Sequence, residues 1–256
     1  MHFVILGCGS SMGVPRSDGH FGKCDPKNKK NYRTRCSALI KTKTESVLID
    51  TSPDLRQQLI KNKIKKIDKV FYSHLHADQT HGINDLRVFY IQNKKTIPVY
   101  ADQPTRKYLF NTFNYIFVAN SKEYPATLKL NSLSKNLSIL DGKKKLKIRT
   151  VKVKHGKINS ICYIIDKKLA YISDISNISK KDYIYFKKLK YLIIDCLWFR
   201  YHPSHLNLEN SLKFINLFKP KKAILTNLHS DLDYNFLKRK LPKNIMPAFD
   251  GLTIKL

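Results

Sequence analysis

The sequence predicts a layered α/β fold with mixed sheets, formed by one domain over residues 1–256. Short apolar runs rich in β-branched residues alternate with longer mixed segments, which is the pattern of strands with interleaved helices. Two apolar runs between Ile161 and Tyr171 follow one another closely enough to form a hairpin. No repeat, low-complexity tract or glycine-serine linker divides the chain, and 42% hydrophobic residues suffice for a substantial core.

The predicted strands are short runs in which β-branched and aromatic residues predominate. They span residues 3–6, 36–41, 46–50, 69–73, 97–101, 147–154, 160–166, 168–173, 191–195 and 223–227. The predicted helices lie between them, at residues 53–61, 83–90, 103–113, 209–218 and 234–240. Pro53 and Asp54 mark the start of the first helix, because proline suits the first turn and a carboxylate complements the positive end of the helix dipole.

The chain carries a formal charge of +29, from 48 Lys and Arg against 19 Asp and Glu. A charge of this size can attract nucleic acid or an anionic membrane. However, only nine of the basic residues are Arg, and the lysines are dispersed in short runs, which is typical of solvated surfaces. Abundant Lys, Ile and Asn are also what an A/T-rich genome encodes. The charge therefore allows RNA as a partner but does not favour it.

The sequence predicts a cytoplasmic protein without a membrane partner. No apolar run approaches the roughly 20 residues that span a bilayer, and the segment before Gly7 lacks the basic start and cleavage site of a secretory signal. The five cysteines include no CxxC pair and no zinc-ribbon spacing. In a chain with so large a core, we expect them to be reduced thiols rather than a disulfide framework.

The segment from Tyr72 to Arg87 carries the strongest functional signal. It places His74, His76 and Asp78 at alternate positions directly after an apolar strand. In an extended loop, this spacing can point two imidazoles at one ion while the carboxylate turns toward a second. Imidazole and carboxylate are ligands that zinc and related first-row metals prefer. The spacing therefore predicts a metal site.

Four further ligand-type residues lie at the C-terminal ends of predicted strands. They are His155, Asp174, Asp195 and His229. In α/β sheets these strand ends form a common rim where functional sites assemble. We therefore expect these residues to gather near the first histidines.

With these residues the chain resembles the metallo-β-lactamase-fold hydrolases, and more closely their branch of PhnP-like cyclic-phosphate phosphodiesterases. The likeness covers nearly the whole chain and is carried by residues 6–15, 48–56, 76–87 and 204–209 together with the ligand residues. It implies a four-layer αβ/βα sandwich, in which two mixed β-sheets pack face to face with helices outside. The likeness is more specific for the fold than for the substrate.

The resemblance implies two divalent metal ions, zinc or manganese, and assigns their ligands. The first ion would be held by His74, His76 and His155, the second by Asp78 and His229, and Asp174 would bridge both. Two such ions can activate a bridging water and neutralise a phosphodiester. The implied partner is a small cyclic or nucleotide-like phosphodiester, and homodimers are common among these proteins.

The same resemblance assigns catalytic roles to Asp78 and His205. Hydrolysis would proceed by attack of a metal-bound hydroxide, and His205 would protonate the leaving alkoxide as the general acid. A histidine is suited to this task because its pKa lies near neutral pH. The alternative for His205 is a surface histidine that precedes a helix.

Two positions depart from the family pattern. The signature normally continues with histidine after Asp78, whereas this chain has Gln79, and an amide oxygen is a poorer zinc ligand than imidazole. We therefore expect the second site to bind weakly, to prefer a harder ion such as manganese, or to recruit His81. His81 is equally well explained as an ordinary polar residue beside the site. Of the cysteine-rich loop that holds a structural zinc in some PhnP-like enzymes, only Cys24 is present, so no structural zinc is expected.

Three residues are candidates for supporting roles. Asp50 follows a strand that reads as buried, where an aspartate either orients the ligand loop or caps the next turn. Arg33 and Arg35 lie near the motif segments in a chain that otherwise uses lysine. Guanidinium binds phosphate in a bidentate manner, so both are candidates for the substrate phosphate. Internal pairing with carboxylates is the alternative for both arginines.

Two other functions compete with the phosphodiesterase. One is an RNA-processing nuclease similar to tRNA 3′-end endonucleases, although no long insertion corresponds to their tRNA-clamping arm. The other is a non-hydrolytic metal-binding protein similar to PqqB, which Gln79 and the Ser-Pro-Asp-Leu-Arg element at residues 52–56 support. Retention of all six metal ligands argues against this second alternative.

Overall fold

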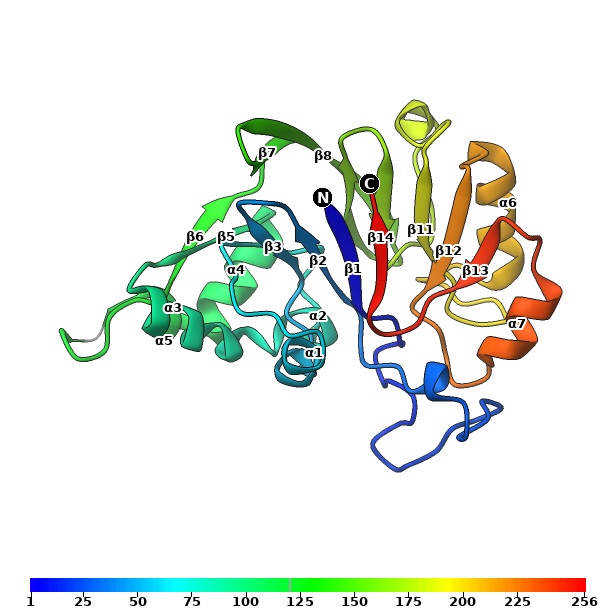
Figure 1. The fold of residues 1–256 in the computed structure, drawn as a ribbon, viewed down its shortest axis with the longest axis horizontal. Coiled ribbons are helices and arrows are strands. Elements are labelled where there is room, and N and C mark those ends of the chain that lie inside the picture. Colours follow the sequence, from blue (N-terminus) through cyan, green and yellow to red (C-terminus); the bar gives the residue numbers. More distant parts are fainter. Residues whose placement is uncertain (120) are drawn as a thin grey trace.

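The computed structural model describes residues 1–119 and 121–256, which contain two mixed β-sheets of seven strands each (Figure 1). The strands are β1 His2–Gly7, β2 Ser37–Lys41, β3 Ser46–Ile49, β4 Lys69–Phe71, β5 Ile97–Ala101, β6 Leu128–Ser132, β7 Asn136–Asp141, β8 Lys144–His155, β9 Ile158–Ile165, β10 Leu169–Ile172, β11 Tyr191–Asp195, β12 Lys222–Thr226, β13 Ile245–Pro247 and β14 Leu252–Lys255. The first sheet has the order β14-β1-β2-β3-β4-β5-β6 and the second the order β13-β12-β11-β10-β9-β8-β7.

Helices cover the outer faces of the two sheets. They are α1 Leu55–Lys61, α2 Ala77–Thr80, α3 Arg87–Asn93, α4 Gln103–Thr112, α5 Asn114–Phe117, α6 Leu208–Phe218 and α7 Tyr234–Lys240, with 3₁₀ turns η1 Lys29–Asn31, η2 Ile83–Leu86 and η3 Lys180–Tyr185. In Figure 1, α1 to α5 lie beside the first sheet and α6 and α7 beside the second. This is the αβ/βα sandwich that the resemblance implies.

Alternation along the strands builds the layers. In β1, Phe3 and Ile5 pack between the two sheets, whereas Val4 and Leu6 face the helices of the first sheet. Phe3 meets Tyr171 of the second sheet, with 5.4 Å between ring centroids. The outer face of the second sheet packs on α6 and α7 through a third apolar cluster. The period of two along each strand therefore produces both the central core and the outer cores.

The ten predicted strands and five predicted helices are confirmed, with their ends shifted by a few residues. One helix differs in kind, because residues 83–90 form η2 followed by α3. The sequence analysis missed β6, β7, β13 and β14, and these are the four edge strands of the two sheets. Edge strands bury fewer side chains, so their apolar pattern is weaker than that of central strands.

The topology places the functional strand ends together. The pairs β3–β4 and β4–β5 in the first sheet are parallel, as are β10–β11, β11–β12 and β12–β13 in the second. The segments that follow β4, β10, β11 and β12 therefore leave their sheets at the C-terminal edges. No helix in the described residues is long and apolar enough to cross a membrane. All five cysteines are buried free thiols.

Candidate active site

Three imidazoles converge at the C-terminal edge of the sheets. His74 follows β4, His76 lies two residues further on, and His155 ends β8. The Nδ1 of His76 lies 3.0 Å from Nε2 of His74 and 3.3 Å from Nε2 of His155. Nitrogens bound tetrahedrally to one zinc ion at about 2.1 Å lie about 3.4 Å apart. These three nitrogens could therefore hold one first-row metal ion.

Hydrogen bonds on the far side of two of these rings set their orientation. The Nδ1 of His155 lies 2.7 Å from the carbonyl oxygen of Ser204, and Nδ1 of His74 lies 3.0 Å from Oγ of Ser73. Because each Nδ1 is engaged in this way, Nε2 of each ring is left to face the other imidazoles. Such partners fix the tautomer and the direction of metal-binding histidines.

Asp50 supports the loop that carries His74. It is fully buried, has a positive φ of 62°, and accepts a 2.7 Å hydrogen bond from the backbone N–H of Ser73. The carbonyl of Ser73 in turn accepts a hydrogen bond from the backbone N–H of Ile161 in the second sheet. These contacts attach His74 to both sheets, as an orienting role for Asp50 would require.

Burial keeps the three imidazoles neutral. It lowers the pKa of His74 to about 3, and it lowers the pKa of His76 and of His155 below the usual value. A neutral imidazole has the free lone pair that a metal ion requires. Imidazoles with lowered pKa values could accept a cation without first losing a proton.

His205 lies beside this group, with 4.7 Å between its ring centroid and that of His155. Its Nδ1 lies 2.8 Å from Oδ2 of Asp195, the last residue of β11, and 3.9 Å from Oδ1 of Asp174. Burial alone would lower the pKa of His205, but Asp195, Asp174 and Asp78 raise it to about 9. The ring can therefore carry a proton at neutral pH, which the predicted general acid requires.

A pocket of about 360 Å³ contains the site. His76, Asp78, His155, Asp174, His205 and His229 all line it. The two groups of three ligand atoms in the described residues are His74 with His76 and His155, and His155 with Asp174 and His205. Asp78 and His229 thus share the pocket but belong to neither group.

Gln79 and His81 occupy different surroundings. Gln79 is fully buried, and its Nε2 lies 3.0 Å from Oδ2 of Asp78 and 3.4 Å from Oδ2 of Asp174. The Nε2 of His81 lies 2.8 Å from the hydroxyl oxygen of Tyr108 in α4, and the two rings are stacked. The structure therefore brings Gln79 into the site and directs His81 to the helical layer.

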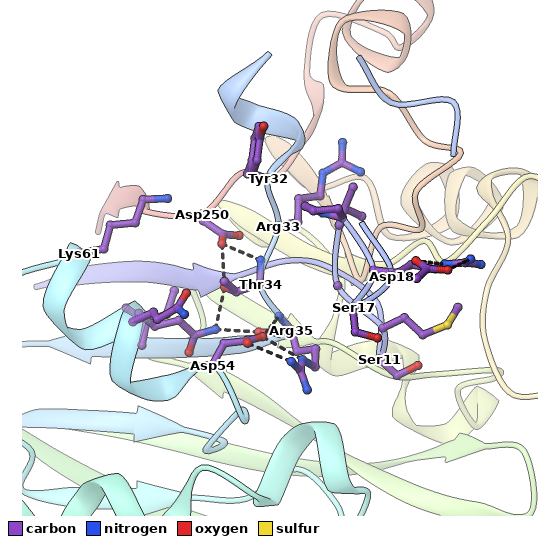
Figure 2. Close-up of a pocket in the computed structure, with 18 residues that line it drawn as sticks. Ser11, Ser17, Asp18, Tyr32, Arg33, Thr34, Arg35, Asp54, Lys61 and Asp250 are labelled. Atoms are coloured by element: carbon purple, nitrogen blue, oxygen red, sulfur yellow. Dashed lines mark hydrogen bonds and ion pairs between the residues drawn. The ribbon is translucent and has the colours of Figure 1, made fainter. Parts of the chain in front are cut away.

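Arg33 and Arg35 line a second pocket of about 670 Å³ (Figure 2). Arg35 makes a bidentate pair with Asp54, at 2.9 and 3.0 Å, and Figure 2 shows the two side chains side by side. Arg33 is buried and donates to the carbonyl oxygens of His229 and Leu232, so it supports the loop that carries His229. Arg35 therefore has the carboxylate partner that the sequence left open, whereas the internal partners of Arg33 are carbonyl oxygens rather than a carboxylate.

The sequence analysis missed several contributors to the pocket. Asn227 follows β12 and donates its side-chain amide to Oδ1 of Asp195 at 3.2 Å. Trp198 and His202 come from the segment after β11, and Trp198 packs against His229 with 4.9 Å between ring centroids. Ser204 acts through its backbone carbonyl, which no sequence pattern can indicate. Asn227 could have been found, because it follows a strand in the same way as Asp174.

A family model described as the β-lactamase superfamily domain matches residues 45–227. The chain belongs to the β-lactamase superfamily. Together with the fold and the histidine group, this membership makes the protein a metallo-β-lactamase-fold hydrolase with residues that could hold divalent metal.

Comparison with solved structures shows that the protein is PhnP-like. The crystal structure of a new diphosphatase from the PhnP family is similar with a TM-score of 0.87 and 31% identity, over 100% of this chain and 97% of that one. Two more distant structures show the fold alone. PqqB from Methylobacterium extorquens, bound to Zn²⁺, has a TM-score of 0.80 and 16% identity, over 100% of both chains. The short form of human tRNase Z has a TM-score of 0.69 and 17% identity, over 100% of this chain and 99% of that one.

A longer relative also matches this superfamily member. A protein from Porphyromonas gingivalis (strain ATCC BAA-308 / W83) named octanoyltransferase is 31% identical over 260 residues. The match covers 98% of this chain and 51% of the relative, so the chain spans about half the length of that protein.

Proposed function

We propose that this protein is a metal-dependent phosphodiesterase that hydrolyses a small cyclic or nucleotide-like phosphodiester. The observation that carries the proposal is the position of His205, which is held by Asp195 beside the three-histidine group. A general acid next to a cation site is the arrangement needed to cleave an ester whose leaving alkoxide must be protonated. The 360 Å³ pocket suits a small molecule.

In the proposed reaction, His74, His76 and His155 would hold a zinc or manganese ion. When bound, the ion supplies positive charge for the phosphoryl oxygens and lowers the pKa of a water molecule. The water attacks phosphorus, the P–O bond to the leaving group breaks, and His205 gives its proton to the departing oxygen. The proton lost by the water passes to Asp78, a pocket carboxylate whose pKa is raised by burial and by Asp174. A linear diester would give a phosphomonoester and an alcohol, whereas a cyclic diester would give a single phosphomonoester that carries the freed hydroxyl group.

A diphosphate link is the second substrate class that we consider. The similar PhnP-family structure is named a diphosphatase, and attack at phosphorus would serve a phosphoanhydride equally well. Octanoyl transfer is not carried over from the longer relative, because the chain spans only about half of that protein. The proposal assigns the enzyme to the cytoplasm, where the five buried thiols would stay reduced.

Comparison of substrate classes tests this proposal. The metal-loaded protein is assayed with bis-(p-nitrophenyl) phosphate, p-nitrophenyl phosphate, a 2′,3′-cyclic nucleotide, an esterified nucleoside diphosphate and a precursor tRNA. We expect turnover of the small diesters to exceed that of the monoester and of the tRNA. Faster cleavage of the diphosphate would favour the second class. Cleavage of the tRNA alone, at its 3′ end, would favour the nuclease. If none of these substrates is turned over, the proposal that the protein is a phosphodiesterase is contradicted.

A variant pair adds a matched control to these assays. His74→Ala removes one imidazole of the buried group, whereas His81→Ala removes an imidazole that contacts Tyr108. We expect the first variant to lose turnover and the second to retain it. Equal activity in the two variants would contradict the assignment of the site.

A further inference from the structure

The buried side chain of Gln79 lies between two carboxylates of the site. Its Nε2 is 3.0 Å from Oδ2 of Asp78 and 3.4 Å from Oδ2 of Asp174. A primary amide nitrogen has two N–H groups, so one can be directed to each carboxylate. The residue thus connects the expected ligand of the second ion with the expected bridging ligand.

The orientation of this amide directs its nitrogen, rather than its carbonyl oxygen, toward the two carboxylates. Turning the amide by 180° would point Oε1 at two negatively charged oxygens, which is repulsive unless a cation separates them. In the present orientation, the N–H groups provide the positive ends of two dipoles to Asp78 and Asp174. The Oε1 atom is buried and has no hydrogen-bond partner among the described residues. The two contacts to carboxylates are therefore what holds the side-chain amide in place.

The other ligands expected for a second ion do not gather around Asp78. The Nδ1 of His229 accepts a hydrogen bond from the backbone N–H of Asp231 and its ring packs on Trp198, so only its Nε2 is free of hydrogen bonds to the described residues. His81, the candidate substitute, contacts Tyr108 in α4. In the described part of the chain, no group of three ligand atoms within 4.8 Å of one another includes Asp78 or His229.

We infer that this protein binds one metal ion per chain, at His74, His76 and His155, and that the side-chain amide of Gln79 takes the place of a second ion. The inference deepens the proposed function and rests on it for the first ion. It replaces the expectation of two ions that the resemblance implied. The residues that would hold a second ion do not fit one, because Gln79 directs N–H groups, which cannot bind a cation, toward Asp78 and Asp174.

The number of metal ions per chain tests the inference without any assay of activity. The full chain is stripped of metal with a chelator, titrated with Zn²⁺, Mn²⁺ or Co²⁺, and freed of excess metal. The number of metal ions bound per chain is then measured by inductively coupled plasma mass spectrometry. We expect one ion per chain in the wild type and two in Gln79→His, which restores the imidazole of the family pattern. Cobalt gives an independent readout, because two neighbouring Co²⁺ ions are magnetically coupled and give a different electron paramagnetic resonance signal from a single bound ion.

Two further variants keep the result interpretable if Gln79→His does not fold. Asp78→Asn should retain one ion, because Asp78 lies outside the three-histidine group. His74→Ala should retain none. Two ions per wild-type chain would overturn the one-ion inference and leave the proposed function intact, whereas no ion would overturn both. Loss of the ion in Asp78→Asn, or one ion in a folded Gln79→His, would also overturn the inference.

Discussion

The Nδ1 atom of His205 lies 2.8 Å from Oδ2 of Asp195, and Asp195 is completely buried at the end of β11. The other oxygen of that carboxylate accepts a hydrogen bond from the amide of Asn227, while Oδ2 also accepts the backbone N–H of Ile175. The carboxylate that orients His205 is therefore fixed by two strand ends. This network allows the role of His205 to be tested separately from metal binding.

The first prediction concerns the leaving group. His205→Ala should slow hydrolysis of a diester with an alkyl leaving group by about 10²-fold or more, which is the usual contribution of a general acid. Hydrolysis of a p-nitrophenyl diester should slow much less, because p-nitrophenolate leaves without a proton. The measurement is kcat for both substrates in the wild type and variant. A similar loss on both would mean that His205 does not act as the acid.

Asp195→Asn provides the second prediction. The amide keeps the shape of Asp195 but removes the negative charge that favours protonated His205. We expect the same selective loss on the alkyl diester, smaller than in His205→Ala, with an unchanged number of bound ions. An equal loss on both substrates, or loss of the metal, would show that Asp195 supports the site in another way.

The third prediction concerns pH and stability. Asp250 accepts hydrogen bonds from the backbone N–H of Cys8 and from the backbone and hydroxyl of Thr34. Burial raises its pKa to about 6, although the hydrogen bonds from Thr34 oppose this rise. A carboxyl whose pKa is higher in the folded state binds more protons there than in the unfolded state. Its contribution to stability is therefore present at about pH 4 and lost as the pH rises through about 6.

Asp250→Asn isolates this effect because an amide does not titrate. Between pH 4 and pH 7 the free energy of unfolding of the wild type should fall by about 2 kcal/mol relative to the variant. This magnitude follows from the raised pKa of Asp250, and solvent weakens it little because the side chain is only partly exposed. Chemical denaturation at both pH values measures this difference. A constant gap between the two proteins would contradict the prediction.

The fourth prediction concerns Gly82, which lies just after α2 and against the backbone at the start of α1. A Cβ atom at Gly82 would overlap the carbonyl oxygen of Ser52 and lie 2.9 Å from Cβ of Leu55. Gly82→Ala should therefore reduce the free energy of unfolding by about 3 kcal/mol, because backbone atoms cannot easily move away. At Gly19 an added Cβ meets no atom within 4 Å, so Gly19→Ala should cost only about 1 kcal/mol for its positive φ. Equal losses would show that the contact at Gly82 relaxes freely.

The sequence predicted the central strands and the grouping of the three histidines because both depend on local patterns. The alternate placement of His74 and His76 after β4, and of His155 at the end of β8, could be recognised without the structure. The four edge strands could not, because their side chains are partly exposed and their apolar pattern is weak. Asp50 could be placed only as a supporting residue, since its bond to Ser73 depends on the neighbouring strand.

The partners of polar side chains were the least predictable part of the site. Nothing in the sequence indicates that His81 contacts Tyr108 or that Gln79 lies between two carboxylates. Arg35 pairs with Asp54, which is 19 residues away in the sequence. Such contacts depend on how the loops pack, and for each of these side chains the sequence offers several possible partners at similar separations. Asn227 and the carbonyl of Ser204 were missed because neither belongs to a metal-ligand pattern.

Metal-dependent turnover tests the central claim most directly. The protein is stripped of metal, and hydrolysis of bis-(p-nitrophenyl) phosphate is measured before and after Zn²⁺ or Mn²⁺ is restored, beside His74→Ala and the control His81→Ala. The account predicts that turnover is absent without metal and returns with it in the wild type and in His81→Ala, but not in His74→Ala. Turnover that is unaffected by removal of the metal, or that survives in His74→Ala, would contradict it.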